Sequence, residues 1–484
     1  MAVGDMEPKN LWKHFEKFLS IPHTSGNEAG MGEYVLAWAK EKGFEAEQDA
    51  RGNVVVRVPA TAGKEGAPVV VLQGHMDMVG EKNSDLDFDF MKDAIQTEMD
   101  GDWLTAKGTT LGADNGIGLA AGMAAAEADD IVHGPLEILA TVDEEVGLTG
   151  AAEIQPGFLK GEMMLNLDSE ELGEVTIGCA GGGDSNITLP ITRNDAPAGT
   201  KPFTLKVFGL RGGHSGIDIH EQRGNAIKVI TRIIGTITAS QPAHLIEIKG
   251  GNKRNAIPRE AFAELMILET AVKDVEELVS DWIAKIAIEL GGKEKGIGAS
   301  LTPSENGGGK VLDEKSQATL LDLLIALPHG VEAMNYDIDG LVETSNNLAT
   351  IAMTDGEAKI GTSTRSSIKT ALQALRDRIS ADARLAGAAV VENEPYPGWM
   401  PNVDSDLLKI FQGVHKEVFG EEPKTIAIHA GLECGIIGEK FPGMDMVSFG
   451  PDIQHPHSPD ERVNVPSVAK FYQLVEALLT KLAG

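Results

Sequence analysis

Short apolar segments that end in a histidine or a carboxylate recur along this 484-residue chain. The segment VVVLQG leads to His75, LEILATVDE leads to Glu145, and MMLNL leads to Asp168. Apolar runs of this length predict buried β-strands, and open α/β sheets place their binding crevices just beyond the carboxyl ends of such strands. Asp114 in LGADNG and His457 in HPHSPDE offer the same chemistry outside these segments. We therefore expect a fold whose strands end around one polar site.

Helical and strand patterns alternate in the first part of the chain. Residues 31–44 and the alanine-rich residues 114–128 predict helices, while 51–58, 67–73 and 136–142 predict strands. Strands that alternate with helices predict a mostly parallel sheet that is covered on both faces. The predicted fold class is therefore α/β, with a mixed, mostly parallel sheet flanked by helices.

Two breaker-rich stretches interrupt this alternation, GCAGGGDSN (178–186) and ENEPYPGWMPN (392–402). The residues between them carry their own helix and strand patterns, enough for an independent α/β domain of ordinary size. Because His457 follows the second stretch but has the character of a ligand for the first part, both ends of the chain are expected to build one domain. The predicted division is a catalytic domain with parts at 1–184 and 397–484, and an inserted domain at 185–396.

The five candidate ligands are imidazoles and carboxylates, a mixture that suits zinc, manganese or cobalt better than calcium or magnesium. Asp77 lies two residues after His75, so on a continuing strand the two side chains share a face and the carboxylate can orient the ring. Glu144 precedes Glu145, and adjacent acids at a strand end point to different sides. One acid can bind a metal while the other acts as a general base. The sequence therefore indicates a metallohydrolase.

Each candidate also has an ordinary structural interpretation. His75 alone would be a satisfied core histidine, and the pair Glu144 and Glu145 would be a solvated acidic turn. Asp114 could be a helix N-cap, and so could Asn115. The recurrence of ligand types in matching contexts favours the metal site, while capping stays open for Asn115.

The formal net charge of −31 disfavours nucleic acid and anionic membranes as partners, because both repel an acidic surface. A small cationic or zwitterionic ligand is compatible with this charge. The two cysteines, Cys179 and Cys434, are too few for a disulfide framework and indicate buried residues in a reducing compartment. Neither a signal peptide nor an apolar run of the ~20 residues that a membrane span needs is evident. A cytoplasmic location is predicted.

Eight short motifs carry a resemblance to a known family: GHMD, GTTLGADNG, DEEVGLTGA, LDSEE, GGHSG, RNAIP, HAGLECG and HSPDE. Each motif alone is weak, but together they extend over essentially the whole chain. On these motifs the sequence resembles peptidase D, the aminoacyl-histidine (carnosinase-like) dipeptidase branch of the co-catalytic zinc aminopeptidase, carboxypeptidase and aminoacylase superfamily. The resemblance implies a zinc-peptidase-like catalytic domain with an inserted lid. It also implies hydrolysis of dipeptides with a free N-terminus, including β-alanyl-histidine.

The resemblance further implies a role for each candidate ligand. Asp114 would bridge two divalent metal ions. His75 and Asp168 would hold one of these ions, and Glu145 and His457 would hold the other. Zinc is the expected metal, with manganese and cobalt as alternatives.

Two further roles and one choice between histidines come from the same resemblance. Glu144 would be the general base, taking a proton from a metal-bridging water and passing it to the leaving amine. Asp77 would orient His75. The motif HSPDE selects His457 over its neighbour His455 as the ligand.

In relatives the inserted domain acts as a lid and often carries dimer contacts, so a homodimer through this domain is expected. His214 would stabilise the tetrahedral oxyanion, from its own or a partner subunit, although a turn histidine that caps the following helix is an equal alternative. Asn255 and Arg365 would bind the substrate carboxylate, with a surface salt bridge as the alternative for Arg365. His429 in HAGLECG is expected at most to line the pocket.

Other functions remain open at this point. A related di-metal deacylase or amidase acting on N-acyl amino acids would use the same metals and differ in the lid. A metal-binding scaffold without turnover would be expected to lose Glu144, which is present. A phosphoesterase would need arginine or lysine near the ligands to clamp phosphate, and no such cluster is evident.

Overall fold

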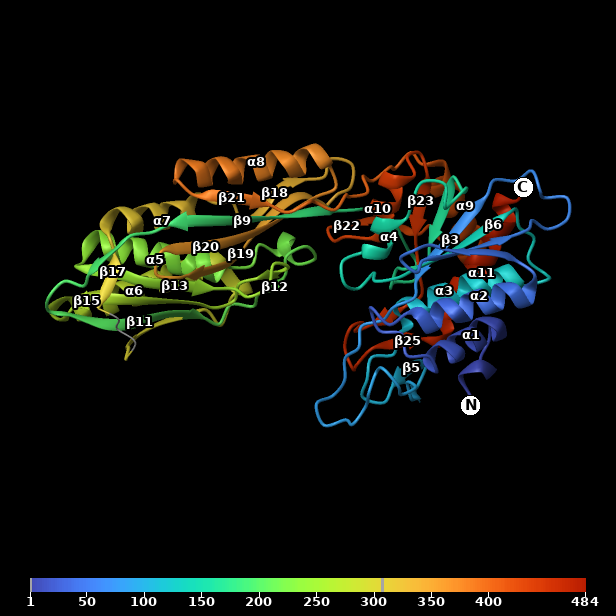
Figure 1. Ribbon diagram of the computed structural model, residues 1–484, viewed down its shortest axis with the longest axis horizontal. Coiled ribbons are helices and arrows are strands. Elements are labelled where there is room, and N and C mark those ends of the chain that lie inside the picture. The colour runs from blue at the N-terminus through green and yellow to red at the C-terminus, as the bar shows by residue number, and fades with distance from the viewer. Residues whose placement is uncertain (1, 306–308) are drawn as a thin grey trace. The chain divides into compact units, whose positions relative to one another are not determined.

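The computed structural model describes residues 2–305 and 309–484, and the chain divides into two compact units. The first unit runs to Cys179 and resumes with Trp399–Ala427 and Leu432–Gly484. The second unit comprises Ala180–Gly398 and Ile428–Gly431. Both units combine helices with strands (Figure 1), so the predicted α/β class is confirmed.

An eight-stranded sheet forms the centre of the first unit. Across the sheet the strands follow the order β1 (Glu45–Gln48), β2 (Val54–Val58), β6 (Leu136–Thr141), β3 (Val70–His75), β7 (Met163–Asn166), β23 (Asp445–Ser448), β8 (Glu174–Cys179) and β22 (Lys424–Ile428). The four middle strands, from β6 to β23, are parallel to one another, while β1, β2 and β8 pair antiparallel. Parallel strands bring their carboxyl ends to the same edge, which is the edge where the candidate ligands were predicted.

Helices cover both faces of this sheet. They are α1 (Lys9–Leu19), α2 (Ala29–Lys42), α3 (Ala113–Glu127), α4 (Thr149–Glu153), α9 (Asp406–Phe419), α10 (Glu433–Lys440) and α11 (Val465–Leu482). Leu72 and Ile138 lie against Gly122 of α3. Val71 and Leu139, one position away on the same strands, share a core with apolar residues of α4 and α10. Strands buried on both faces need apolar side chains at successive positions, which explains the continuous apolar runs in the sequence.

A smaller four-stranded sheet belongs to the same unit. Its strands follow the order β24 (Ile453–Gln454), β25 (Arg462–Asn464), β5 (Trp103–Ala106) and β4 (Thr97–Asp100). Strand β25 pairs antiparallel with β5, where Val463 lies opposite Leu104. The loop that contains His457 precedes β25, and the segment after β5 leads to α3. This pairing therefore brings two ligand-bearing segments together.

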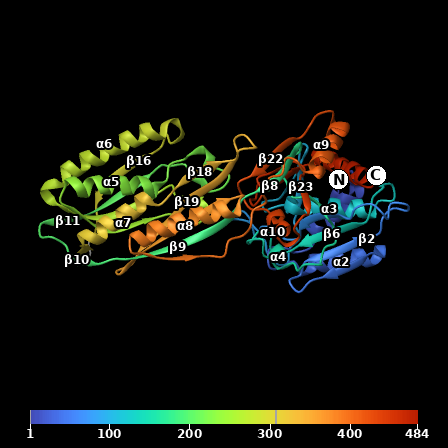
Figure 2. The ribbon, with the colours of Figure 1, turned by 90° about the horizontal axis from the view of Figure 1, so that it is seen from above.

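The second unit contains a nine-stranded sheet whose described pairings are all antiparallel. The strands follow the order β16 (Gly298–Pro303), β11 (Thr200–Phe208), β15 (Ala261–Leu268), β13 (Ala243–Gly250), β19 (Val342–Met353), β20 (Glu357–Ser366), β9 (Gly181–Pro190) and β21 (Ala389–Glu392), with β18 (Gly330–Met334) beside β19. Four helices lie along this sheet (Figure 2): α5 (Ala226–Ser240), α6 (Val272–Leu290), α7 (Glu314–Ala326) and α8 (Lys369–Leu385). Their apolar faces and the inward side chains of the strands form one core. Alternation of buried and half-buried residues in β11 is the pattern of a sheet covered on one face.

Short elements complete the two units. Strand β10 (Arg193–Asp195) pairs with β17 (Lys310–Leu312), and β12 (Gly213–His214) pairs with β14 (Ala256–Ile257). Short 3₁₀ helices lie at Val3–Asp5, Ile219–Glu221, Glu269–Ala271 and Gly291–Lys293. None of the helices in the described part of the chain is long and apolar enough to cross a membrane.

The glycine cluster that was predicted to mark a crossing between domains begins strand β9. Backbone atoms of residues 396–398 pass next to Gly181, and a Cβ added at Gly182 would lie 2.4 Å from the hydroxyl oxygen of Tyr396. The guanidinium group of Arg376 lies against Gly183. The three glycines are therefore required for close packing in the second unit, in addition to their position near the boundary between the units.

Most predicted elements are present with shifted ends. The helix predicted at 31–44 is α2, which is followed by Gly43 in the left-handed conformation, and the helix predicted at 114–128 is α3 (Ala113–Glu127). Strands β1, β4 and β5 and helices α7 and α10 were not predicted, because they are short or lack a continuous apolar stripe. The inserted segment was predicted only as an α/β domain, and the structure adds that the described strands of its main sheet pair antiparallel.

Candidate metal centre

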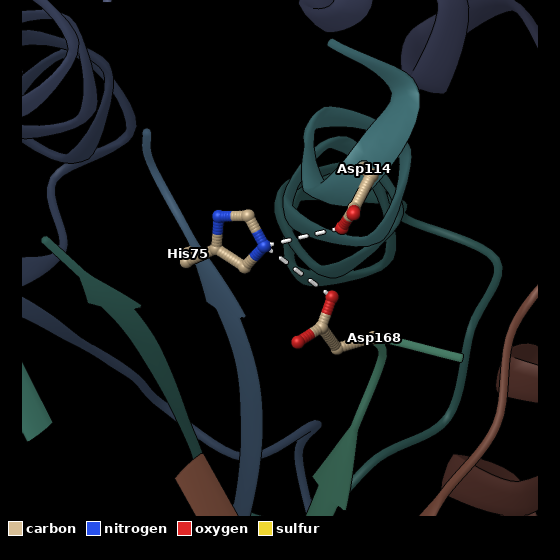
Figure 3. A group of neighbouring side chains, drawn as sticks. All are labelled: His75, Asp114 and Asp168. Carbon is tan, nitrogen blue, oxygen red and sulfur yellow. Dashed lines mark hydrogen bonds and ion pairs between the residues drawn. The ribbon is translucent and has the colours of Figure 1, made fainter. Parts of the chain in front are cut away.

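The first group of candidate ligands lies where strands β3 and β7 end. His75 is the last residue of β3, Asp168 follows β7 by two residues, and Asp114 lies in the first turn of α3. Nε2 of His75 is 3.2 Å from Oδ1 of Asp114 and 3.4 Å from Oδ1 of Asp168 (Figure 3). The side chains of His75 and Asp168 are 1% and 7% exposed. Three ligand atoms therefore converge in a buried space at the carboxyl edge of the sheet.

The second group of candidate ligands contains His457, Glu145 and again Asp114. Nε2 of His457 is 3.2 Å from Oδ2 of Asp114 and 3.0 Å from Oε2 of Glu145. His457 lies in the loop between β24 and β25 with a left-handed φ of 59°, and its side chain is 50% exposed. His455 has a left-handed φ too, but no described group of ligand atoms includes it. Of these two histidines, His457 is therefore the one that lies within a group of potential ligand atoms.

Asp114 faces the two groups with different oxygens, Oδ1 toward His75 and Oδ2 toward His457. Gly112, with a left-handed φ of 75°, occupies the N-cap position of α3 and provides no side-chain cap. Asn115 does not cap the helix either, because its buried Oδ1 accepts no hydrogen bond from the described residues. Its Nδ2 donates to the carbonyl oxygen of Leu167 at 2.7 Å. The capping interpretation of Asn115 is therefore wrong, and Asp114 is positioned to contact an ion in either group.

The chemistry of these side chains fits two divalent metal ions. In each group the imidazole nitrogen and the carboxylate oxygens lie within 4.8 Å of one another. Oε1 of Glu145 is buried and has no hydrogen-bond partner among the described residues. Leaving a buried carboxylate oxygen without a partner is costly, and a cation removes that cost. Imidazole and carboxylate ligands together suit zinc, manganese or cobalt.

In the absence of ions, protons compensate the carboxylates. Burial lowers the pKa of His75, but Asp168, Asp114 and Asp77 raise it more, so the pKa lies well above its ordinary value. Hydrogen bonds to Asp114 and Glu145 raise the pKa of His457 to about 11. Burial raises the pKa of Asp168 to about 6. An ion that binds here must displace protons, so its affinity rises with pH.

Glu144 lies close to the ligands of both groups. One of its carboxylate oxygens is within 4.8 Å of ligand atoms of His75 and Glu145. Burial raises the pKa of Glu144 well above its ordinary value; His75 opposes this rise, and Asp168 and Glu433 add to it. A carboxylate whose pKa is raised binds a proton more readily than an exposed one, which is the property that a general base needs.

Asp77 connects the histidine of the first group to the acids that follow β6. Its carboxylate accepts hydrogen bonds from the hydroxyl of Ser25 at 2.8 Å and from the backbone N–H groups of Glu144 at 3.0 Å and Glu145 at 3.2 Å. Nδ1 of His75 is 2.9 Å from the carbonyl oxygen of Asp77 and 3.5 Å from its carboxylate. The closer partner of the ring is therefore the backbone of Asp77. Ser25 was not predicted, since it lies 52 residues away from Asp77 in sequence.

A buried polar layer lies beneath the first group of ligands. Nε2 of Gln73 donates to Oε2 of Glu433 at 2.6 Å, and the hydroxyl of Thr141 donates to the same oxygen at 2.7 Å. The amide of Asn166 also hydrogen-bonds to Gln73. Gln73 and Asn166 each lie two residues before a ligand, His75 and Asp168. Glu433 is fully buried, and burial raises its pKa to about 7. The sequence offered no sign of this layer beyond the motif HAGLECG.

Glu461, the last residue of the motif HSPDE, is a second buried acid near the ligands. It is 2% exposed, and its carboxylate accepts hydrogen bonds from the backbone N–H groups of residues 111–114. Burial and the charge of Asp114 raise the pKa of Glu461 to about 7, whereas the amides of Gly112, Leu111 and Ala113 oppose that rise. The motif distinguishes His457 from His455 in the sequence but gives no indication of a role for Glu461.

The predicted substrate-binding residues all lie in the second unit. Nδ1 of His214 accepts hydrogen bonds from the backbone N–H groups of Gly216 at 3.3 Å and Ile217 at 3.1 Å. His214 therefore lies in a turn, but it does not cap the helix that follows, whose N-cap position is Asp218 and has no side-chain cap. The turn leaves Nε2 of His214 available as a donor. Burial and then Arg365 lower the pKa of His214, so the ring is neutral near neutral pH.

Arg365 is 7% exposed, and its Nη1 donates to the hydroxyl of Tyr396 at 3.0 Å. The alternative of a surface salt bridge is therefore wrong for this residue. Nε2 of His429 is 2.7 Å from the hydroxyl of Ser345, and burial together with Arg365 lowers the pKa of His429 to about 3. Asn255 is exposed, and its carbonyl oxygen accepts a hydrogen bond from the backbone N–H of Ser215.

Comparisons with known proteins identify the family of this chain. The family model "Peptidase family M20/M25/M40" matches residues 71–481. A cytosol non-specific dipeptidase of Escherichia coli (strain K12) is 42% identical over 480 residues, 99% of this chain and 99% of the relative. The solved structure of an aminoacylhistidine dipeptidase from Vibrio alginolyticus is 42% identical, has a TM-score of 0.92, and aligns with 99% of this chain and 98% of its own. An aminopeptidase (PepT) from Bacillus cereus, 16% identical with a TM-score of 0.58 over 99% of this chain and 100% of its own, shares the fold.

The family model covers most of the chain, and the relative from E. coli covers nearly all of it at well over 30% identity. The family resemblance expected from the sequence motifs is confirmed: the chain belongs to the M20/M25/M40 peptidase family.

Proposed function

We propose that this chain is a metal-dependent dipeptidase that hydrolyses dipeptides with a free N-terminus, including aminoacyl-histidines such as β-alanyl-histidine. One observation carries the proposal: the two oxygens of Asp114 face two separate groups of ligands, with Glu144 beside them. Two divalent ions would occupy these groups, zinc first, with manganese and cobalt as alternatives. Two relatives that are 42% identical over nearly their whole length are named dipeptidases, which supports the same substrate class.

Two ions bound here would polarise the scissile carbonyl group and lower the pKa of a water molecule. His75 and Asp168 would hold one ion, Glu145 and His457 would hold the other, and Asp114 would touch both. Each of these side chains must be free of its proton to do so.

Glu144 is the residue that moves the proton. It takes the proton from the attacking water and returns it to the leaving amine, which its raised pKa allows it to hold in between. Asp77 keeps Glu144 within reach, because its carboxylate accepts the backbone N–H groups of both Glu144 and Glu145.

We infer that the second unit is the inserted lid domain. Neutral His214, whose Nδ1 already accepts two backbone hydrogen bonds, would donate from Nε2 to the oxyanion. The guanidinium group of Arg365 and the exposed amide of Asn255 would bind the substrate carboxylate.

We propose a homodimer formed through the second unit, in the cytoplasm, with a small peptide as substrate and no nucleic acid or membrane as partner. The name of the E. coli relative supports the location, and the net charge of −31 supports the absence of anionic partners.

The proposal is tested by hydrolysis assays on protein that has been stripped of metal and then supplied with zinc, manganese or cobalt. The substrates are β-alanyl-histidine, other aminoacyl-histidines, an unblocked dipeptide without histidine, a tripeptide and an N-acetyl amino acid. Metal-dependent cleavage of the unblocked dipeptides supports the proposal. Cleavage of the N-acetyl compound alone moves the assignment to a deacylase, and metal binding without turnover moves it to a scaffold.

A further inference from the structure

Glu461 lies at the junction of the two segments that carry Asp114 and His457. Oε2 of Glu461 accepts hydrogen bonds from the backbone N–H groups of Leu111 at 2.7 Å and Gly112 at 3.1 Å. Oε1 accepts from Ala113 at 2.8 Å and from Asp114 at 3.4 Å. One buried carboxylate therefore accepts hydrogen bonds from four consecutive backbone amides at the start of α3.

The same residue also fixes the loop that carries His457. The backbone N–H of Glu461 donates to the carbonyl oxygen of Ser458 at 3.0 Å, which closes the turn. The hydroxyl of Thr105 donates to the carbonyl oxygen of Glu461 at 2.9 Å. Since the His457 side chain is half exposed, its own packing does little to hold it in place. Its position depends on the turn that Glu461 closes.

The other histidine has no such dependence. His75 ends the central strand β3, its side chain is 1% exposed, and its Nδ1 lies 2.9 Å from the carbonyl oxygen of Asp77. Paired strands on both sides, β6 and β7, fix its backbone. A change at Glu461 therefore disturbs the two groups of ligands to different extents.

We propose that Glu461 is a positioning residue that holds Asp114 and His457 in one fixed relation and thereby maintains the second group of ligands. This inference rests on the proposed function, because it assumes that both groups bind metal ions. Replacing the carboxylate should loosen the ion held by His457 and Glu145, while the ion held by His75 and Asp168 stays.

The substitution Glu461→Gln tests this with almost no change in size. A glutamine amide has one acceptor oxygen and two N–H donors, so it would direct N–H groups at two of the four backbone amides. Glu137 offers a matched control in the same unit. It is also 2% exposed, and its Oε2 accepts the backbone N–H groups of Lys160 at 2.8 Å and Gly161 at 3.0 Å. It lies near the start of β6, at the end of the strand away from Glu144 and Glu145.

The experiment counts the ions that remain after zinc-loaded protein is dialysed against a weak chelator, and titrates cobalt into stripped protein while its visible absorption is recorded. The expected result is two ions for the wild type and for Glu137→Gln, and one ion for Glu461→Gln. The weaker site of Glu461→Gln should lose at least about ten-fold in affinity, the range for residues that orient ligands. The cobalt spectrum should change only for the second equivalent.

Two ions at wild-type affinity in Glu461→Gln, or loss of both ions together, overturns the inference. Absence of ions in the wild type contradicts the proposed function instead, so the two failures are distinguishable. If Glu461→Gln does not fold, Thr105→Val removes the hydrogen bond to the Glu461 carbonyl and leaves the carboxylate in place. It should weaken the second site by a smaller factor, and an unchanged second site in that variant overturns the inference.

Discussion

The two groups of ligands share Asp114 but are built in different ways. His75 ends β3 and Asp168 follows β7, its parallel neighbour in the centre of the sheet, and both side chains are nearly buried. His457 lies in a loop between two short strands, with a half-exposed side chain and a left-handed backbone. The first group is therefore fixed by the sheet before any ion arrives, whereas the second is fixed by hydrogen bonds between loops. We expect the first group to bind its ion more tightly.

Removal of Asp114, the ligand that the two groups share, should have the largest effect on metal binding and activity, because it weakens both groups at once. In Asp114→Ala each group loses one carboxylate, so both ions should be lost and activity should fall by more than about 10⁴-fold, beyond the contribution of proton transfer alone. Metal analysis and a dipeptide assay measure the two results. Asp129→Ala, at an exposed acid just beyond the end of α3, serves as the control. Retention of one tightly bound ion in Asp114→Ala would show that the groups are independent.

Glu144→Gln should separate catalysis from metal binding in both groups. The variant keeps the size of the side chain but cannot take up a proton, so kcat should fall by about 10²–10⁴-fold. Both ions should remain, because Glu144 is not needed as a ligand in either group. Steady-state kinetics and metal analysis on the same preparation decide the matter. Loss of an ion would mean that Glu144 is a ligand, and an unchanged kcat would exclude it as the base.

Asp77→Asn should affect the two groups about equally, in contrast to a change at Glu461. Asp77 contacts His75 of the first group and the backbone of Glu145 of the second. Asparagine keeps one acceptor oxygen, so the affinity for each ion should fall by about 10–100-fold. Isothermal titration of stripped protein measures both sites. Ser25→Ala removes one of the three hydrogen bonds to Asp77 and should give a smaller change in the same direction.

Glu433→Gln should show how strongly the ionisation of Glu433, in the polar layer beneath the first group, lowers the free energy of unfolding. The pKa of buried Glu433 is raised to about 7, above its value in the unfolded chain, so the folded state binds more protons at intermediate pH. Its contribution to stability is complete below about pH 4.5 and is lost as the pH rises toward 7, by at most about 1.4 kcal/mol per pH unit.

Glutamine cannot ionise, so the free energy of unfolding of ion-free Glu433→Gln should decline less between pH 5 and pH 7 than that of the wild type. Urea denaturation at several pH values measures this difference. Parallel pH profiles for the two proteins would show that the pKa of Glu433 is not raised by folding. Glu433 would then be ionised in the folded protein over the whole range from pH 5 to pH 7.

The sequence predicted the fold class and the family, and it named the residues that the structure brings together around Asp114. This was possible because a ligand at the end of an apolar strand has a local signature, and parallel strands end at one edge. The assigned roles of these residues, and the division into a catalytic domain and a lid, remain predictions.

The supporting residues were not predictable in the same way. Glu433, Glu461 and Ser25 act through contacts with residues that are distant in the sequence. An acid that will be buried looks like any surface acid until its partners are known. The sequence did not show that Arg365 is buried, for the same reason. Its strand, β20, has the pattern of an ordinary strand, and Arg365 is buried by packing within the second unit.

Strands β7 and β23 lie side by side in the central sheet, yet about 280 residues separate them in the chain. At roughly 5–20 residues per second, synthesis of that interval takes about 15–55 s. During this time β7 has no partner on one side, and an unpaired strand edge is a template for pairing with other chains. The whole second unit is translated and can fold in the meantime. The yield of this protein in a cell therefore depends on how well that edge is protected until β23 arrives.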